Sequence, residues 1–226
     1  MKKLVIYGVS RASAQSYYDF TTDSHYELGA FTLEKSAIKE PTFFGLPVVP
    51  FEEVETIYPP SEYMMFVAVY FKRVNQTRMQ KFEQAKAKGY ELANFISSKA
   101  IVWPGLKVSE NVMIAEGAIV KPYTQIGMNT FILTGAVVSH DCVVGNHCYL
   151  AVRSVMLASA QVGDCSVIGG NATILNGVKV AKSNIISAGA VINSDTKDFE
   201  VYTVPQPTLQ PLPSDKMANI IFKVQV

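Results

Sequence analysis

A histidine and an aspartate stand side by side at His140 and Asp141. An imidazole that titrates near its usual value of about 6.5 is mostly neutral at pH 7, so it can accept a proton from an attacking nucleophile. A carboxylate beside it can fix its tautomer and stabilise the imidazolium that forms. Because adjacent residues on a strand or turn can point apart, His140 is the stronger candidate, as general base, and Asp141 the weaker, as its partner. A solvated surface histidine is the alternative interpretation.

A second candidate site lies near the N-terminus, where the apolar run 3–7 leads into residues 8–13. In an open α/β sheet, phosphate groups bind at such a strand-to-helix turn, on free N–H groups of the first helical turn. The segment reads GVSRAS and lacks the G-x-G-x-x-G pattern, so fewer backbone amides can approach a pyrophosphate. Arg11 could supply charge instead. Phosphate binding and a plain strand-to-helix turn both remain open here.

The elements that position these residues are indicated by a period of six. Every sixth residue from Val102 to Ile192 is aliphatic, and neither a helix nor a flat strand produces that spacing. A hexapeptide repeat does, because six residues form a short strand and a turn, and three such units close a triangular coil. The positions are Val102, Val108, Ile114, Val120, Ile126, Ile132, Val138, Val144, Leu150, Met156, Val162, Ile168, Ile174, Val180, Ile186 and Ile192.

Mostly small side chains stand two residues before the aliphatic ones, where a coil corner leaves little room. Cys142 and Cys148 occupy such positions, which predicts packed core thiols rather than reactive ones. Cys165 falls elsewhere in its hexapeptide, has no basic neighbour in sequence, and is expected to be structural too. In the same frame His140 follows the inward-facing Val138 by two residues, so we expect it at a coil corner, facing outward.

The residues before the repeat alternate between strand and helix patterns. This alternation predicts a small open α/β sheet of the Rossmann type over residues 1–98. We expect the β-helix over residues 99–196. Residues 197–226 form a proline-rich tail with a candidate edge strand at 218–226. Strands are predicted at 3–7, 26–33, 46–49, 64–70 and 92–96, and helices at 12–20 and 74–88.

The composition fits a globular protein. The 226 residues suit one long or two modest domains, and 20 Lys and Arg against 19 Asp and Glu leave a net charge of +1. That balance gives no electrostatic case for a nucleic-acid or anionic-membrane partner, and no apolar run reaches the roughly 18 residues of a membrane span. The N-terminal apolar run is too short for a signal peptide, so we expect a cytoplasmic protein. Three cysteines without a C-x-x-C motif argue against a disulfide framework and a thiolate zinc site.

Three stretches carry a resemblance to a known family: residues 6–10 (IYGVS), residues 134–145 (TGAVVSHDCVVG) and the coil pattern through Ile192. A small Rossmann-like domain followed by hexapeptide coils with a His-Asp pair resembles the bacterial sugar acyltransferases. Within them it is similar to the sialic-acid O-acetyltransferase and UDP-4-amino-sugar N-acetyltransferase family. The resemblance covers residues 1–205. It implies a left-handed β-helix, a homotrimer, acetyl-CoA in the groove between adjacent β-helices, and a nucleotide-linked sugar as acceptor.

The resemblance also implies roles for residues on the β-helix. His140 would be the general base, with Asp141 as its partner, for an amine or hydroxyl that attacks the thioester. Ala158 stands one coil later, where the family commonly has a glycine whose N–H polarises the thioester oxygen. Gly170 and Ala188 fall where the family lines its CoA groove.

Two further positions on the coils depart from the family. Tyr149 stands where relatives often place a second histidine that touches the acetyl group, and a phenol can still donate one hydrogen bond toward CoA. His147, two residues earlier, is interpreted as a surface residue. In the tail, Gln206 and Pro207 stand where relatives carry a basic residue that could meet CoA phosphate.

The acceptor side departs more strongly. Of the family's glycine-rich loop, only Gly8, Ser10 and Arg11 remain as candidate acceptor ligands. The aspartate pair that holds uracil in UDP-sugar users is replaced by Thr32 and Leu33, and the glycine that ends the third strand is Tyr70. Either the acceptor is not a UDP-sugar, or this pocket binds it through other residues.

The leading hypothesis is therefore an acyl-CoA-dependent sugar acyltransferase that transfers acetyl to an amino group or a hydroxyl without a metal. A non-catalytic trimer that binds nucleotide sugar and CoA is the second hypothesis, motivated by the altered positions. A zinc enzyme of the carbonic-anhydrase kind is the third. It needs three histidines around the metal, and the chain has only His25, His140 and His147, the first in the other domain.

Overall fold

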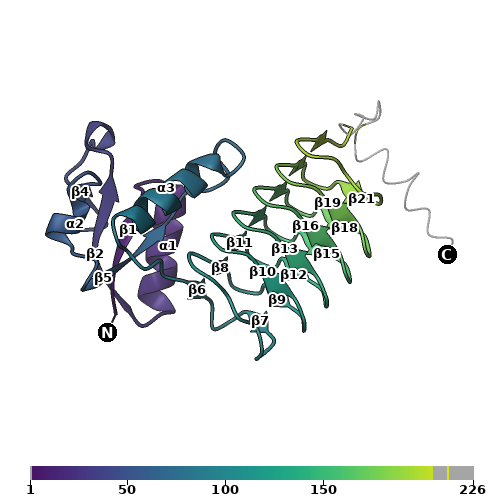
Figure 1. Ribbon diagram of the computed structural model, residues 1–226, viewed down its shortest axis with the longest axis horizontal. Helices are drawn as coiled ribbons and strands as arrows, with labels where there is room; N and C mark the ends of the chain where they lie inside the picture. The colour runs from purple at the N-terminus through teal and green to yellow at the C-terminus, as the bar shows by residue number, and fades with distance from the viewer. Residues whose placement is uncertain (1, 206–212, 214–226) are drawn as a thin grey trace.

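The computed structural model describes residues 2–205 and residue 213, so the candidate edge strand at 218–226 lies outside the described residues. Figure 1 shows the two parts of the chain, an α/β part built by the N-terminal residues and a stack of short strands built by the later ones. The strands and helices expected in the first part and the hexapeptide coils expected in the second are present.

The N-terminal part contains a five-stranded sheet in the order β3-β4-β2-β1-β5. Its central strands are apolar and buried because helices and the β-helix cover both faces. All neighbouring strands are parallel except β3 and β4, which form an antiparallel hairpin at the edge. The strands are β1 (Lys2–Tyr7), β2 (Tyr26–Leu33), β3 (Thr42–Phe43), β4 (Leu46–Pro50) and β5 (Tyr63–Val67).

Helices connect the parallel strands. Helix α1 (Arg11–Thr22) follows β1 directly, and helix α3 (Gln76–Ala87) follows β5. A short helix α2 (Val54–Ile57) and a single 3₁₀ turn η1 (Lys35–Ala37) lie between them. Gly89 adopts φ +90° just after α3, as expected for a glycine that ends a helix.

The segment predicted as one strand at 92–96 divides between the two parts. Leu92 forms a parallel bridge with Met65 of the N-terminal sheet. Three residues later, β6 (Phe95–Ile96) pairs instead with the β-helix strand β8 (Met113–Ile114). The chain therefore passes from the sheet to the first coil without a flexible linker.

The coils form a parallel β-helix. Neighbouring strands on a face are parallel and 18 residues apart, as in the pairing of Ile132 with Leu150, so three strands make one turn; the last pair, β20 and β22, is 16 residues apart. The strands after β6 and β8 are β7 (Ile101–Val102), β9 (Ile119–Val120), β10 (Gln125–Ile126), β11 (Phe131–Ile132), β12 (Val137–Val138), β13 (Val143–Val144), β14 (Tyr149–Leu150), β15 (Val155–Met156), β16 (Gln161–Val162), β17 (Val167–Ile168), β18 (Thr173–Ile174), β19 (Lys179–Val180), β20 (Ile185–Ile186), β21 (Val191–Ile192) and β22 (Val201–Tyr202).

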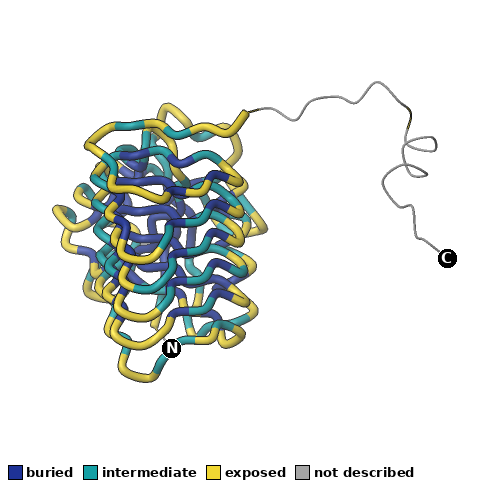
Figure 2. The backbone as a smooth tube through the Cα atoms, turned by 90° about the vertical axis from the view of Figure 1, so that its right-hand side faces the viewer, coloured by how far each residue is buried: buried dark blue, intermediate teal, exposed yellow. Residues whose placement is uncertain are grey.

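The prism has three faces, named here for later use. Face 1 consists of β7, β9, β12, β15, β18 and β21; face 2 consists of β10, β13, β16 and β19; face 3 consists of β6, β8, β11, β14, β17, β20 and β22. Figure 2 shows the coils with buried positions toward the interior and exposed positions at the rim. The N-terminal part packs on face 3, where Met113, Phe131, Tyr149 and Val167 join its core.

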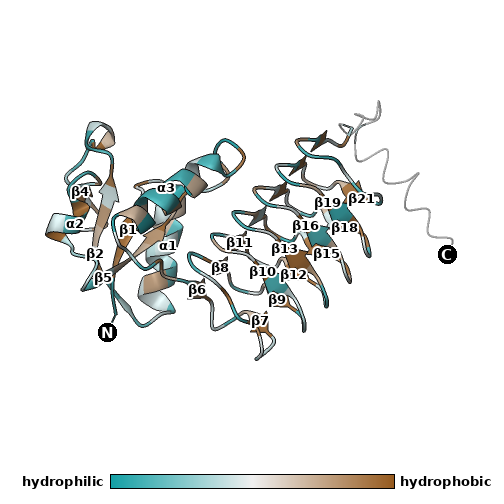
Figure 3. Cartoon of the chain, viewed as in Figure 1, coloured by the Kyte–Doolittle hydropathy of each residue, from teal (hydrophilic) through white to brown (hydrophobic). Residues whose placement is uncertain are grey.

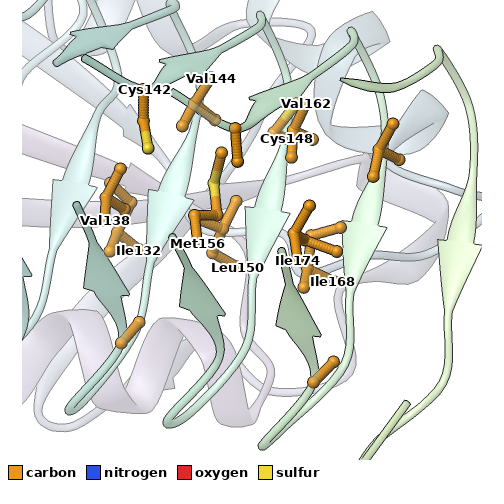
Figure 4. Packing of buried hydrophobic residues seen from close by; sticks show 14 of the residues in the cluster. Ile132, Val138, Cys142, Val144, Cys148, Leu150, Met156, Val162, Ile168 and Ile174 are labelled. Carbon is orange, nitrogen blue, oxygen red and sulfur yellow. The ribbon is translucent and has the colours of Figure 1, made fainter. Parts of the chain in front are cut away.

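The interior of the prism is aliphatic, as the period of six predicts. Figure 4 shows Val138, Leu150 and Met156 converging inside the coils, and each is at most 1% exposed. Cys142 and Cys148 lie in the same core, and burial raises the pKa of the Cys148 thiol to about 12, so both predicted core thiols are confirmed. Figure 3 shows hydrophobic stretches in both parts of the chain.

The corners of the prism share one backbone conformation. A positive φ recurs at every sixth residue from Asn111 to Gly189, on glycine, asparagine, aspartate and serine at most of these turns. These types tolerate the left-handed region, because they lack a bulky side chain or bond locally to the backbone. Tyr123 and Arg153 adopt it too, with φ of 65° and 58°.

Candidate functional site

The first half of the candidate site is the turn between β12 and β13, at the corner where face 1 meets face 2. His140 Nδ1 and Asp141 Oδ2 are 2.7 Å apart, and about half of each side chain is exposed. With Asp141 ionised, Nδ1 carries the proton and the lone pair of Nε2 is left for a substrate. Asp141 has φ of 59°, like the other corner residues, so its conformation comes from the coil and not from local strain.

Ala158 stacks directly above His140. The Ser159 N–H donates to the His140 carbonyl at 3.1 Å, and the next coil donates to the Ala158 carbonyl from Gly177 at 3.0 Å. The φ of Ala158 is not positive, so its methyl group introduces no backbone strain. Among the described residues the Ala158 N–H donates to no other group, which leaves it free toward a ligand.

The remaining residues predicted to contact CoA lie elsewhere on the prism. Gly170 and Ala188 are in turns between face 3 and face 1, at a different corner from His140. Tyr149 is on face 3 and only 5% exposed, with its ring against Tyr70 at 5.6 Å and Phe71 at 5.0 Å. Within one chain the structure therefore brings His140, Asp141 and Ala158 together and keeps the other three apart from them.

The second half of the candidate site is a cavity of about 760 Å³ at the carboxyl ends of β1, β2 and β5. Gly8, Ser10, Arg11 and Tyr70 line it, which brings together four of the five predicted acceptor residues. Gly8 has φ of +116°, and a Cβ there would lie 2.6 Å from Ser13 Oγ, so the turn into α1 needs glycine. The first turn of α1 lies at this edge; the Ser10 side chain accepts from the Ser13 N–H in a capping box, and the N–H groups of Arg11 and Ala12 have no partner within the helix.

Thr32 is the predicted acceptor residue that the structure places elsewhere. Its side chain is fully buried and its hydroxyl donates to the Val49 carbonyl at 3.0 Å, so it joins β2 to β4 and does not line the cavity. The next two residues, Leu33 and Glu34, line the cavity in its place. Thr32 lies inside β2, whereas β2 ends at Leu33, so Leu33 and Glu34 lie at the carboxyl end of the strand, where the cavity is.

Glu34 is a cavity residue that the sequence reasoning missed. The Tyr7 hydroxyl donates to the carboxylate at 2.7 Å from each oxygen, and Lys81 forms an ion pair with it. Burial raises the pKa of Glu34, but the hydrogen bonds from Lys81 and Tyr7 outweigh it and hold the pKa below its usual value. Glu34 could have been predicted from its position, since an acidic residue at the end of the second strand is typical of nucleotide-binding sheets.

Helix α3 joins the N-terminal part to the β-helix through Arg78, which is fully buried. The guanidinium donates to the carbonyls of Val69, Asn129, His147 and Cys148 at 2.9–3.2 Å. Burial lowers the pKa of Arg78 to about 10, so it stays charged at neutral pH. These bonds fix the N-terminal sheet, and with it the cavity, against the β-helix.

The prediction that His147 is a surface residue is wrong, since the side chain is only 8% exposed. The Asn129 Nδ2 lies 2.8 Å from His147 Nδ1, and Asn111 donates to Asn129 at 2.8 Å, so three corner residues form a ladder across successive coils. Burial and the charge of Arg78 lower the pKa of His147. Its ring nitrogen accepts from the asparagine amide, which fits a neutral imidazole.

Within residues 2–205 no group of three or more His, Cys, Asp or Glu side chains could hold a metal ion. His140 and His147 lie at different corners of the prism and bond to Asp141 and Asn129 respectively. No helix of the described part of the chain is long and apolar enough to cross a membrane.

No protein-family model matches the sequence, and no curated protein sequence matches it. Solved structures do. PerB from Caulobacter crescentus in complex with CoA and GDP-perosamine is 26% identical, with a TM-score of 0.77 over 89% of this chain and 92% of that one. The acetyltransferase domain of PglB from Neisseria gonorrhoeae is 23% identical, with a TM-score of 0.75 over 89% and 96%. WeeI from Acinetobacter baumannii is 21% identical, with a TM-score of 0.62 over 89% and 94%.

The likeness to the last two concerns the fold alone. The likeness to the perosamine N-acetyltransferase of Caulobacter crescentus confirms the predicted resemblance of this chain to the hexapeptide-repeat sugar acetyltransferases.

Proposed function

We propose that the protein is an acetyl-CoA-dependent sugar acetyltransferase whose acceptor is a nucleotide-linked amino sugar. The observation that carries the proposal is the His140–Asp141 pair, 2.7 Å apart and open to solvent at a coil corner. A general base with an oriented tautomer is the group that acyl transfer to a neutral amine needs. The similarity to perosamine N-acetyltransferase from Caulobacter crescentus, solved in complex with CoA and GDP-perosamine, supports the same function.

In the proposed reaction the acceptor amine attacks the thioester carbon directly. The new C–N bond forms as Nε2 of His140 takes the proton from the amine, and Asp141 stabilises the imidazolium. The Ala158 N–H stabilises the charge that develops on the thioester oxygen. When the C–S bond breaks, the imidazolium returns the proton to the leaving CoA thiolate, so the enzyme ends unchanged and no metal takes part.

The two halves of the site lie on opposite sides of one chain. The acceptor cavity belongs to the N-terminal part on face 3, whereas His140 is at the corner between faces 1 and 2. That corner is opposite face 3 in a triangular prism. An acceptor held in the cavity can therefore reach only the His140 of a second chain, which supports the predicted trimer.

Face 1 supplies a surface for that assembly. Five of its six outward residues are apolar and at least partly exposed, and the sixth is Thr173; the five are Ile101, Ile119, Val137, Val155 and Val191. Face 2 presents mostly polar residues at the equivalent positions. A contiguous apolar sheet face on a folded chain is typical of a protein interface.

Three chains with face 1 toward a common axis would complete the site. The corner of face 1 that carries His140 would then meet the corner of the next chain that carries Gly170 and Ala188. Acetyl-CoA would lie between these corners, and the acceptor would enter from the cavity beside Tyr70. The cavity chemistry, with a helix N-terminus and Arg11, fits a Rossmann-like nucleotide site.

A non-catalytic trimer that binds CoA and nucleotide sugar is the second candidate. It is favoured by Tyr149, whose ring is buried against Tyr70 where relatives place a residue that touches the acetyl group. The two candidates differ in turnover and not in binding.

Thiol release from acetyl-CoA against a panel of nucleotide-linked amino and hydroxyl sugars separates them. We expect release with an amino sugar, and a loss of about 10²–10⁴ in rate for His140→Ala because the general base is removed. His25→Ala is the matched control, since His25 is an exposed histidine in the N-terminal part and should leave the rate unchanged. CoA binding without release from any acceptor would favour the scaffold, and no CoA binding would contradict both candidates.

A further inference from the structure

The loop between β5 and α3 holds an unfavourable backbone conformation. Arg73, Val74 and Asn75 have φ of 52°, 51° and 63°, three left-handed residues in a row without a glycine. A β-branched residue such as valine is a true outlier in this region, because its side chain collides with the backbone. Such a loop persists only where its surroundings stabilise it, and residues of this kind cluster at ligand clamps and active sites.

The β-helix provides the stabilising contacts. Asn75 is completely buried and donates to the carbonyls of Cys165 and Ser166 at 3.1 and 3.2 Å. At the other end of the loop, the Phe71 ring packs against Tyr149 at 5.0 Å. The coils of the second part thus hold a loop of the first part in one conformation.

That conformation places a cation in the acceptor cavity. Lys72, the residue between the two anchors, lines the cavity together with Arg11 from the start of α1. In the described part of the chain neither residue makes an ion pair, whereas Lys81, the third cation of the lining, is paired with Glu34. Two positive charges without an ion-pair partner among the described residues therefore face the same space beside the first turn of α1.

We infer that Lys72 and Arg11 form a clamp for the diphosphate of the nucleotide-linked acceptor, with the strained loop 71–75 holding Lys72 in place. The inference rests on the proposed function and adds a residue to its acceptor site. Two side-chain cations compensate for the amides that a glycine-rich loop would provide, because Gly8 is followed by VSRAS and not by further glycines. A pair of fixed cations matches the two charged phosphates of a nucleoside diphosphate.

Arg73 offers a matched control for this clamp. It is the next residue in the same loop, carries the same charge and is equally exposed, but it does not line the cavity. The experiment measures binding of GDP, UDP, their monophosphates, their nucleosides and inorganic pyrophosphate by calorimetry. The proteins are wild type, Lys72→Gln and Arg73→Gln, each checked for an unchanged unfolding temperature.

We expect Lys72→Gln to weaken binding of the diphosphates and of pyrophosphate about tenfold, with a smaller effect on monophosphates and none on nucleosides. Arg73→Gln should change binding by less than about twofold. Equal losses in both variants would overturn the clamp in favour of a general charge effect, and no loss in Lys72→Gln would overturn it directly. If wild type binds pyrophosphate but no nucleotide, the clamp stands and the proposed nucleotide acceptor fails. If wild type binds none of the probes, both fail.

Discussion

Replacement of Arg78 by methionine tests how the two parts of the molecule are held together. Methionine keeps most of the apolar stem and removes the guanidinium, which donates to four backbone carbonyls. In the described part of the chain, Arg78 is the only hydrogen-bond donor to the carbonyls of Val69, Asn129 and His147. The substitution therefore leaves two buried acceptors, the carbonyls of Asn129 and His147, and one partly buried acceptor, that of Val69, without a partner.

The expected cost follows from those three groups. A buried polar group that loses its partner costs about 1–3 kcal/mol, and loss of the contact between Arg78 and the Phe131 ring, 4.4 Å away, adds to it. Some relaxation and water entry reduce the sum, so we expect a loss of about 4 kcal/mol. For a chain of this size that corresponds to a fall in the unfolding temperature of about 8–16 °C.

Thermal unfolding followed by circular dichroism and by the fluorescence of Trp103 measures the effect. Trp103 is the only tryptophan of the chain and packs at the first coil, so its signal reports on the β-helix. Arg78→Lys should recover part of the loss, and Arg153→Met, at an exposed corner, should change the unfolding temperature by about 1 °C or less. A fall for Arg78→Met no larger than for Arg153→Met would refute the reasoning, because it would mean that water satisfies the three carbonyls at no cost.

Three further predictions concern the coils. Because the pKa of His147 is lowered in the folded protein, the unfolded chain binds a proton on this residue first as the pH falls through about 6.5, and the free energy of unfolding should fall between pH 7 and pH 5. His147→Asn, which extends the ladder from Asn129, should flatten the dependence of unfolding temperature on pH. An unchanged slope would contradict this prediction. Val155→Glu, on face 1, should reduce the sedimentation mass from three chains toward one and abolish thiol release; a wild-type mass near 24.8 kDa would refute the trimer. Tyr123→Asn should stabilise the fold by about 1 kcal/mol, since Tyr123 is 71% exposed at a left-handed corner, and a lower unfolding temperature would instead show that its contact with Trp103 matters more.

The β-helix could be predicted almost residue by residue because its constraint is local and periodic. An inward position such as Ile132 or Val138 is specified by its place in the hexapeptide, whatever the rest of the chain does. The corner placement of His140 followed from the same count. Its bond to Asp141 did not, because a left-handed turn residue decides where that carboxylate lies.

The errors arose where the two parts meet. His147 occupies a corner that the repeat alone leaves exposed, and it is buried because helix α3 and Arg78 cover that corner. The sequence of α3 has a polar helical pattern, and nothing in it predicts that Arg78 is buried among backbone carbonyls of residues some 50–70 positions later in the chain. Thr32 lies one residue before the end of its strand and does not reach the cavity, and Glu34 lies just beyond the predicted strand 26–33.

The 18-residue pairing register determines which insertions and deletions the β-helix can accommodate. Deleting one residue within a coil would turn every later aliphatic side chain toward solvent, whereas deleting or duplicating 18 residues would keep each side chain on its own face. The coils beyond Ala158 could therefore be added or removed as whole units without disturbing the corner that holds His140, Asp141 and Ala158. Because strands pack about 4.8 Å apart, the groove along the prism can change in length only in steps of that size. Under the proposed function, the length of groove available to acetyl-CoA is thus a whole number of coils.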